Sequence, residues 1–243
     1  MKLLSFQTAM RLIYPAQCLC CGDIVHSDFG LCGECWQDTP FIDGAACVQC
    51  SAPLLGPQID QTDLCESCHA SGRPWRQGRA VLHYSGNAKK LVLGLKHGDR
   101  TDIAPPVGRW MAQSVSDIVT PDTIVLPIPL HWSRAAQRKY NQASLLATSM
   151  AKALNIRPLY NVLERTKPTR PLEHIGTQER YDRLLNAIRV KLGKEGLVEG
   201  KSILLVDDVM TSGATFDAAT RACLNACAKK IDVVVLARAA KGG

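Results

Sequence analysis

Paired cysteines are the first residues whose types and spacing could do chemistry. The chain has 243 residues and eleven cysteines, nine of which lie between positions 18 and 68. Two thiolates from one C-x-x-C turn, with two from a second, complete the tetrahedral Cys₄ set of structural zinc. We therefore predict two structural Zn²⁺ sites, with consecutive pairs sharing a metal ion. The eight predicted ligands, in four C-x-x-C pairs, are Cys18, Cys21, Cys32, Cys35, Cys47, Cys50, Cys65 and Cys68.

Three alternatives to this assignment stay open. The pairs could share metal ions in an interleaved order, and Cys20 could replace Cys21 as a ligand. A disulfide framework is the third alternative, and it would need an oxidising compartment. Because four thiolates leave no open position for water, we expect no Lewis-acid catalysis from these centres. The segment has few large apolar side chains, so its folding should depend on the metal.

Two adjacent carboxylates near the C-terminus form the second chemical group. The apolar run 202–206 predicts a buried strand, and Asp207 and Asp208 come directly after it. Backbone N–H groups in a glycine-containing loop before a helix can bind an anion, whereas carboxylates suit sugar hydroxyls or a metal ion. A ribose 5-phosphate satisfies both halves; a solvated acidic turn with a helix cap is the alternative. The predicted phosphate loop consists of Thr211, Ser212, Gly213, Ala214 and Thr215.

Positive charge is concentrated in the second part of the chain. The formal net charge is +7, but residues 1–75 hold three Lys or Arg against eight Asp or Glu, and residues 76–243 hold 26 against 14. Such a basic segment favours an anionic partner, although a solvated basic surface is the alternative for any single residue. The candidate anion ligands are Arg134 and Arg138, on one face of a predicted helix, and Arg165 and Lys167, in a predicted closing loop.

Strand and helix patterns alternate after residue 78. This order predicts an α/β fold with a parallel sheet and helices on both faces, in which ligands bind at the carboxyl ends of the strands. We predict two domains, an N-terminal helix with a double zinc ribbon over 1–75 and the α/β domain over 76–243. Strands are expected at 79–84, 123–129, 159–164, 202–206 and 232–237, and helices at 88–95, 133–154 and 216–228.

Composition excludes several classes of protein. Hydrophobic residues make up 46% and charged residues 21%, as in ordinary globular proteins. No apolar run approaches the 18 or more residues of a membrane span. The segment 1–15 is interrupted by polar residues and lacks a small-residue cleavage site, so we expect a short amphipathic helix rather than a signal peptide.

The segment 203–215 resembles the 5-phosphoribosyl 1-diphosphate (PRPP) motif of type I phosphoribosyltransferases. With the cysteine pairs before it, the chain resembles the ComF/GntX family over most of residues 15–240. The other segments that carry the resemblance are Tyr84-Ser-Gly-Asn87, Leu95-Lys-His-Gly-Asp99, Pro127-Ile-Pro-Leu-His131, Arg134, Arg138, Asn141-Gln142, Arg165-Thr-Lys167 and Arg180. Two departures are Arg138-Lys-Tyr140-Asn-Gln, where the family pattern has Arg-Gly-Phe-Asn-Gln, and Pro171-Leu-Glu173-His174, where it has a glutamine.

The resemblance implies a cytoplasmic, PRPP-binding protein with Mg²⁺ as the companion of the ligand. By position, Asp207 and Asp208 would hold the ribose and 211–215 the 5-phosphate. The segment implied near the pyrophosphate consists of Pro127, Ile128, Pro129 and Leu130.

Two classes of function remain open on the sequence. The first is an enzyme that transfers ribose 5-phosphate from PRPP by positioning and electrostatics, with no dedicated nucleophile, so no catalytic residue is assigned. The second is a non-catalytic adaptor that binds single-stranded DNA or nucleotides and works with DNA-uptake proteins, as the resemblance also implies. A PRPP-sensing regulator is a third, weaker reading.

Overall fold

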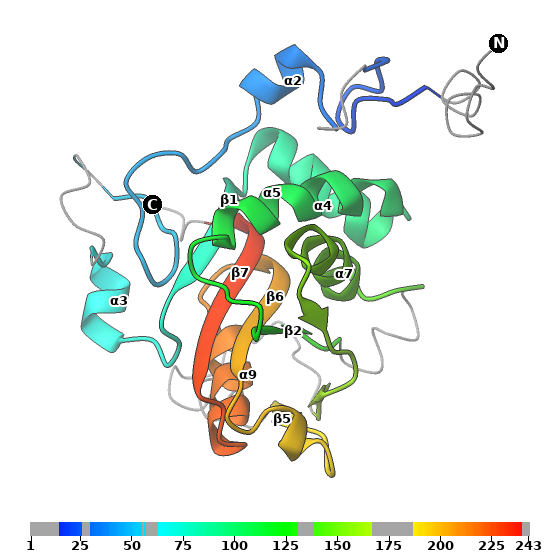
Figure 1. Cartoon of the computed structure of the whole chain (residues 1–243). Helices are drawn as coiled ribbons and strands as arrows, with labels where there is room; N and C mark the ends of the chain where they lie inside the picture. Colours follow the sequence, from blue (N-terminus) through cyan, green and yellow to red (C-terminus); the bar gives the residue numbers. More distant parts are fainter. Residues whose placement is uncertain are drawn as a thin grey trace.

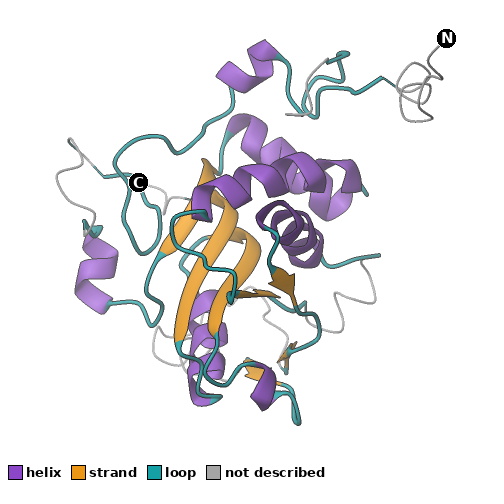
Figure 2. Ribbon diagram, viewed as in Figure 1, coloured by secondary structure: helices purple, strands orange, loops and turns teal. Residues whose placement is uncertain are grey.

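The computed structural model describes residues 15–25, 30–54, 56, 63–130, 139–166 and 187–239. It shows a parallel sheet with helices on both faces (Figure 2). The strands are β1 (Gly78–His83), β2 (Ile124–Pro127), β3 (Arg157–Pro158), β4 (Leu163–Arg165), β5 (Ile188–Val190), β6 (Ser202–Met210) and β7 (Lys230–Arg238). The α-helices are α2 (Gly33–Gln37), α3 (Glu66–Ser71), α4 (Gly86–His97), α5 (Ala104–Val115), α7 (Gln142–Leu154) and α9 (Ala214–Asn225), and the 3₁₀ helices are η1 (Thr101–Ile103) and η2 (Glu195–Leu197).

The strand order of the main sheet has a topological switch point at β2. Five strands pair in the order β1-β7-β6-β2-β3, and each neighbouring pair is parallel. The chain moves outward from β2 to β3 and then returns to place β6 on the other side of β2. In open α/β sheets the crevice outside the carboxyl ends at such a switch point is where ligands bind. A separate antiparallel ribbon is formed by β4 and β5.

Alternating side chains of the central strands divide the core into two layers. Leu204 and Val206 join the cluster that contains α4, α5 and α7, whereas Ile203 and Leu205 join the cluster that contains α9. All four side chains are buried. Figure 1 shows α9 on the side of the sheet opposite to α5 and α7. The predicted α/β class, with helices on both faces of a parallel sheet, is confirmed.

The cysteine-rich segment wraps around the β1 side of the sheet (Figure 1). Its first part shares the core cluster of α4 and α5, and its second part shares the cluster of α9. Between them the chain crosses the edge strand, because Ile42 N donates to Val81 O at 2.9 Å and His83 N donates to Pro40 O at 2.8 Å. The crossing covers backbone groups that an edge strand would otherwise expose.

Several element boundaries differ from the sequence prediction. The helix expected from residue 133 begins at Gln142, where Asn141 caps it by accepting a hydrogen bond from Ala143 N at 3.0 Å; residues 131–138 lie outside the described part. The strand expected to end at residue 206 continues to Met210, because β7 pairs with it as far as that residue. The expected strand 159–164 is replaced by β4, which begins at Leu163.

The longest of the described helices that were not predicted is α5. Helix α5 begins with Ala104-Pro105-Pro106, and two successive prolines usually indicate the end of a helix rather than its interior. Proline is tolerated in the first turn of a helix, where its missing N–H has no partner to lose. The helix then buries a face with Val107 and Met111 against the sheet. The expected N-terminal helix over 1–15 lies almost wholly outside the described residues.

Candidate functional site at the carboxyl end of the sheet

Eight cysteine thiols gather in two separate sets of four. In each set the sulfur atoms all lie within 4.8 Å of one another. The Sγ atoms of Cys21 and Cys32 are 3.7 Å apart, and those of Cys50 and Cys65 are 3.6 Å apart. Zn–S bonds of about 2.3 Å in a tetrahedron place the sulfurs roughly 3.8 Å apart, so both sets fit zinc. The sets are Cys18, Cys21, Cys32 and Cys35, and Cys47, Cys50, Cys65 and Cys68.

This grouping confirms that consecutive C-x-x-C pairs share a site, and it excludes the interleaved order. Cys20 belongs to neither set, although it is the neighbour of Cys21. All eight thiols are free rather than joined in disulfides. The two structural zinc sites are therefore supported by geometry. Of the two remaining cysteines, Cys223 is buried in the core, whereas Cys227 is exposed beyond the end of α9.

Metal analysis of the purified chain is expected to give about two Zn²⁺ per molecule. A strong chelator should unfold residues 15–70, because the binding free energy of structural zinc is folding free energy for such small units. Circular dichroism and limited proteolysis, before and after chelation, measure the loss. A chain that contains no zinc and keeps intact disulfides would contradict the two-ribbon structure.

The carboxylate pair lies in β6 at the point where its neighbour β2 ends. The ladder between these strands stops with Pro127 opposite Val206, whereas β7 continues beside β6 to Met210. Beyond Val206, one edge of β6 therefore faces the crevice. Asp207 and Asp208 are the next two residues, so the sheet itself places both at the predicted ligand site.

The two carboxylates have different surroundings. Successive side chains of a strand point to opposite faces. Asp208 faces the α4 side and forms an ion pair with Lys96, whose Nζ lies 2.9 Å from Asp208 Oδ1. The half-buried Asp207 accepts a hydrogen bond from Asp208 N at 2.8 Å. Burial, and then the charge of Asp208, raise the pKa of Asp207 to about 7, although Lys96 and Arg165 act in the opposite direction.

The predicted phosphate loop follows directly on β6. Residues 211–213 form bends, and Gly213 at φ 82° is the N-cap of α9. This left-handed conformation favours glycine, which turns the chain sharply into the helix. Ala214 N donates to Ser212 Oγ at 3.4 Å. The loop thus presents backbone N–H groups at a helix N-terminus, the arrangement that attracts anions.

The end of β2 forms the opposite wall of the crevice. Ile128 N donates to Val206 O at 2.9 Å, which extends the contact with β6 by one residue. Asn141 Nδ2 donates to Ile128 O at 3.0 Å, and Arg165 Nε donates to Pro129 O at 3.3 Å. Of the predicted pyrophosphate segment, Pro127 and Ile128 are buried. The structure therefore brings the end of β2 and Arg165 to the Asp pair.

The basic residues near the predicted ligand site differ in part from those that the sequence suggested. Arg134, Arg138 and Lys167 lie outside the described residues, so their assignment stays a prediction. Lys96, which pairs with Asp208, was missed as a site candidate, although the motif that carries it was noted in the sequence. Also missed were Arg73 and Arg238, which contact the phosphate loop. Arg238 could have been noticed in the sequence, because it is a charged residue at the end of an apolar strand.

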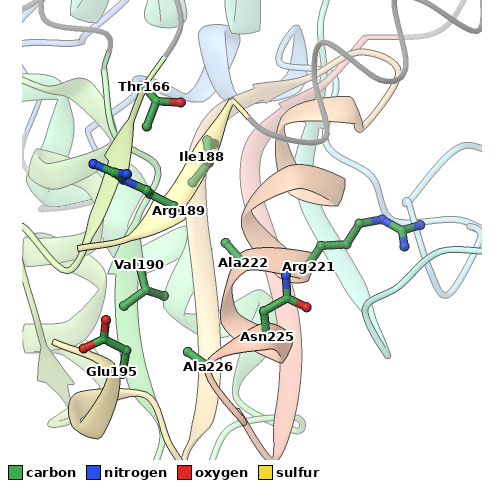
Figure 3. A pocket seen from close by; sticks show the side chains of 9 residues that line it. All are labelled: Thr166, Ile188, Arg189, Val190, Glu195, Arg221, Ala222, Asn225 and Ala226. Atoms are coloured by element: carbon green, nitrogen blue, oxygen red, sulfur yellow. The ribbon is translucent and has the colours of Figure 1, made fainter. Parts of the chain in front are cut away.

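A cavity of about 470 Å³ lies between β5, η2 and α9 (Figure 3). Apolar side chains such as Ile188 and Val190 form part of its wall, with Arg189 and Glu195 near its rim. Among the predicted site residues that the structure describes, none lines this cavity. The candidate site is therefore defined by the sheet edge and the loop rather than by this cavity.

Two family models match the chain. The double zinc ribbon domain matches residues 9–78, and the phosphoribosyl transferase domain matches residues 141–243. The first contains all eight zinc ligands, and the second contains the Asp pair and the phosphate loop.

The chain is similar along its length to curated bacterial proteins. It is 27% identical to the DNA utilization protein YhgH of Escherichia coli, covering 93% of this chain and 99% of that protein. It is 26% identical to competence protein F of Haemophilus influenzae, covering 95% and 100%. A solved glutamine PRPP amidotransferase from B. subtilis is 17% identical with a TM-score of 0.40, covering 59% of this chain and 30% of that one. The chain therefore joins a double zinc ribbon domain to a phosphoribosyl transferase domain and is similar, along nearly its whole length, to these competence and DNA utilization proteins, which confirms the resemblance predicted from the sequence.

Proposed function

We propose that the protein binds PRPP, or a closely related phosphoribosyl ligand, in the crevice between β2 and β6 and transfers its ribose 5-phosphate group. The observation that carries this proposal is the position of Asp207 and Asp208 directly before the glycine-capped loop of α9. Carboxylates repel a phosphate, so their place beside an anion loop calls for a ligand with hydroxyls next to its phosphate. A ribose 5-phosphate has both.

Each part of the crevice has a role in this proposal. The Asp pair accepts hydrogen bonds from the 2′ and 3′ hydroxyls, and the N–H groups of 211–215 hold the 5-phosphate. Lys96 balances the charge of Asp208 when no ligand is present. Arg165 and the end of β2 lie on the side where the diphosphate would extend.

Mg²⁺ fits the oxygen donors of this crevice. The ion takes few protein carboxylates and completes its shell with substrate oxygens and water, so one carboxylate of the pair and the ligand would hold it. When bound, it would neutralise charge on the diphosphate leaving group. The chain's own residues would fix the sugar against the loop and keep the anomeric carbon exposed to the acceptor. Rate enhancement would come from this positioning and from electrostatics.

Release of pyrophosphate tests the transfer itself. The purified protein with PRPP, Mg²⁺ and a pool of amines and bases should release pyrophosphate faster than the same mixture without protein. Asp207→Asn is the site control, and Asp117→Asn, an exposed carboxylate paired with Arg79 near the start of β1, is the charge control. Release that is equal in wild type and Asp207→Asn would reject transfer at this crevice.

PRPP affinity is expected to rise with pH through about 7. The pKa of Asp207 is raised to about 7, so the carboxylate that accepts the sugar hydroxyl forms only as pH increases through that value. Calorimetric titrations from pH 6 to 8 measure the change. Because the ligand phosphates also ionise near pH 6, Asp207→Asn in the same buffers provides the baseline. An identical pH profile in the variant would contradict the assignment of Asp207.

A second candidate function is the binding of single-stranded DNA as an adaptor in the cytoplasm. The relatives named for DNA utilization and competence favour it, and so does the positive charge of residues 76–243. In this alternative the same crevice binds a nucleotide or a DNA end, and the basic surface binds the backbone. Catalysis is then not required.

Single-stranded DNA binding should weaken steeply with salt. The logarithm of the association constant is expected to fall linearly with the logarithm of salt concentration, by about 0.7 per phosphate neutralised. Arg134→Ala with Arg138→Ala should reduce this slope, measured by fluorescence anisotropy. Lys201→Ala with Lys229→Ala removes the same amount of charge just before the first residues of β6 and β7 and should leave the slope unchanged. An absent slope in wild type would reject the adaptor.

A further inference from the structure

Two arginines connect the second cysteine set to the phosphate loop. Arg73 Nε donates to Cys68 Sγ at 3.4 Å, and its Nη1 donates to Ser212 O at 3.0 Å. Arg238 Nε donates to Cys50 O at 2.9 Å, and its Nη2 lies 4.0 Å from Cys50 Sγ. Its Nη1 donates to the carbonyl oxygens of Met210 and Thr211, at 3.1 and 2.5 Å. Each guanidinium therefore contacts a zinc ligand with one part and the loop with another.

Charge gives these contacts a physical reason. Arg238 is only 7% exposed, and a buried guanidinium is costly unless it is paired. A zinc ion held by four thiolates carries a formal charge of about −2, because its two positive charges offset only two of the four ligands. Arg73 and Arg238 together offset that charge. The loaded metal centre is thus the counter-ion that holds both arginines behind the loop.

The direction of the hydrogen bonds matters for anion binding. The arginines bind the carbonyl oxygens of three successive residues, 210–212. In a planar trans peptide the C=O and the following N–H point in opposite directions. The N–H groups of Thr211, Ser212 and Gly213 therefore point away from the arginines. Successive N–H groups with one orientation form the concave nest that binds a phosphate.

Packing supports the same connection. Trp75 is 2% exposed, and its Nε1 donates to the carbonyl oxygen of Gln49, which lies between Cys47 and Cys50, at 2.6 Å. Its ring packs edge-to-face on Phe216 of α9, with centroids 6.1 Å apart, and the Arg73 guanidinium lies 5.4 Å from its centroid. A Cβ at Gly213 would lie 3.1 Å from this ring. The second cysteine set thus supports the loop through a buried aromatic contact as well.

We infer that the second zinc centre sets the conformation of the phosphate loop through Arg73 and Arg238, so that the phosphate nest forms only while Cys47, Cys50, Cys65 and Cys68 hold their metal ion. Both arginines are positioning residues. The inference rests on the proposed function for its ligand, but its effect on the loop can be measured without one. The first cysteine set instead packs into the core cluster of α4 and α5.

Backbone ¹⁵N relaxation tests the arginine contacts. Thr211, Ser212 and Gly213 should have order parameters near 0.85 in wild type, as in rigid backbone, and below about 0.6 in Arg73→Gln. The variant should keep two zinc ions and bind PRPP about tenfold to a hundredfold more weakly, as expected for a lost charged hydrogen bond. Arg76→Gln is the matched control, because Arg76 pairs with Asp232, 3.0 Å away, and not with the loop. Unchanged order parameters in Arg73→Gln would overturn the inference.

Removal of one metal centre at a time tests the role of zinc. Cys65→Ser and Cys21→Ser should each lose one Zn²⁺ per chain, but only Cys65→Ser should lower the order parameters of residues 211–213. Unchanged amide resonances of 231–237 show that the sheet stays folded. Equal effects of the two variants on the loop would overturn the inference. If the wild-type loop is rigid but PRPP does not bind, the proposed ligand is rejected. The order parameters of the two variants would still test whether zinc controls the loop.

Discussion

Asp207→Asn with Asp208→Asn is expected to weaken PRPP binding by about two to four orders of magnitude. A charged hydrogen bond contributes about 1.5–3 kcal/mol, the variant loses one at each ribose hydroxyl, and 1.4 kcal/mol corresponds to a factor of ten. Calorimetric titration with Mg²⁺ measures the loss. The fold should remain, because the amides have the shape of the carboxylates and the partner Lys96 keeps its side chain 22% exposed to water.

The matched control for this variant is Asp117→Asn, which removes a carboxylate near the start of β1. It should bind PRPP as wild type does. Thermal unfolding of the double variant should stay within a few degrees of wild type, which separates a lost contact from a lost fold. If wild type binds and the double variant binds equally well, the ribose assignment is wrong, and a simple phosphate site at 211–215 is the better account.

Gly213→Val should abolish binding of every 5-phosphorylated sugar, whatever is attached at the anomeric carbon. Gly213 has a φ of 82°, which a β-branched residue rarely adopts, and a Cβ there would lie 3.1 Å from Trp75 and 3.2 Å from Arg73 Nη1. The side chain would displace the loop and its N–H groups. Titration with ribose 5-phosphate and with PRPP should show the same loss for both ligands.

Gly193→Val is the matched control for backbone strain. Gly193 has a φ of 80°, but nothing lies within 4 Å of a Cβ built there. Both variants should lose stability of roughly 1–2 kcal/mol through the left-handed conformation, measured by denaturant unfolding. Only Gly213→Val should lose phosphate binding. Retained ribose 5-phosphate binding in Gly213→Val would place the 5-phosphate away from this loop.

Local patterns predicted the parts of the site that lie within one short segment. The C-x-x-C spacing predicted two sets of four thiols, since each pair can bind metal from a single turn. The apolar run with its Asp pair, hydroxyls and glycine predicted the strand, the loop and the helix after it. In both cases the chemistry and the turn that positions it are encoded by neighbouring residues.

The missed residues act across the fold. Lys96 reaches Asp208 only because α4 packs on the face of the sheet to which Asp208 points, and Arg238 reaches the loop only because β7 pairs with β6 to its end. No spacing in the sequence specifies such contacts. The end of β6 was predicted too early for the same reason, which is a contact between distant segments. The polar residues 207 and 208 suggest a turn, but pairing with β7 keeps them in the strand.

A crystal structure with PRPP and Mg²⁺ tests the central claim most directly. Both ribose hydroxyls should lie within hydrogen-bond distance of the carboxylates of Asp207 and Asp208, and the 5-phosphate should lie on the N–H groups of 211–215. The diphosphate should extend toward the end of β2 and Arg165. PRPP bound elsewhere, or a crevice that stays empty at millimolar ligand, would contradict the account.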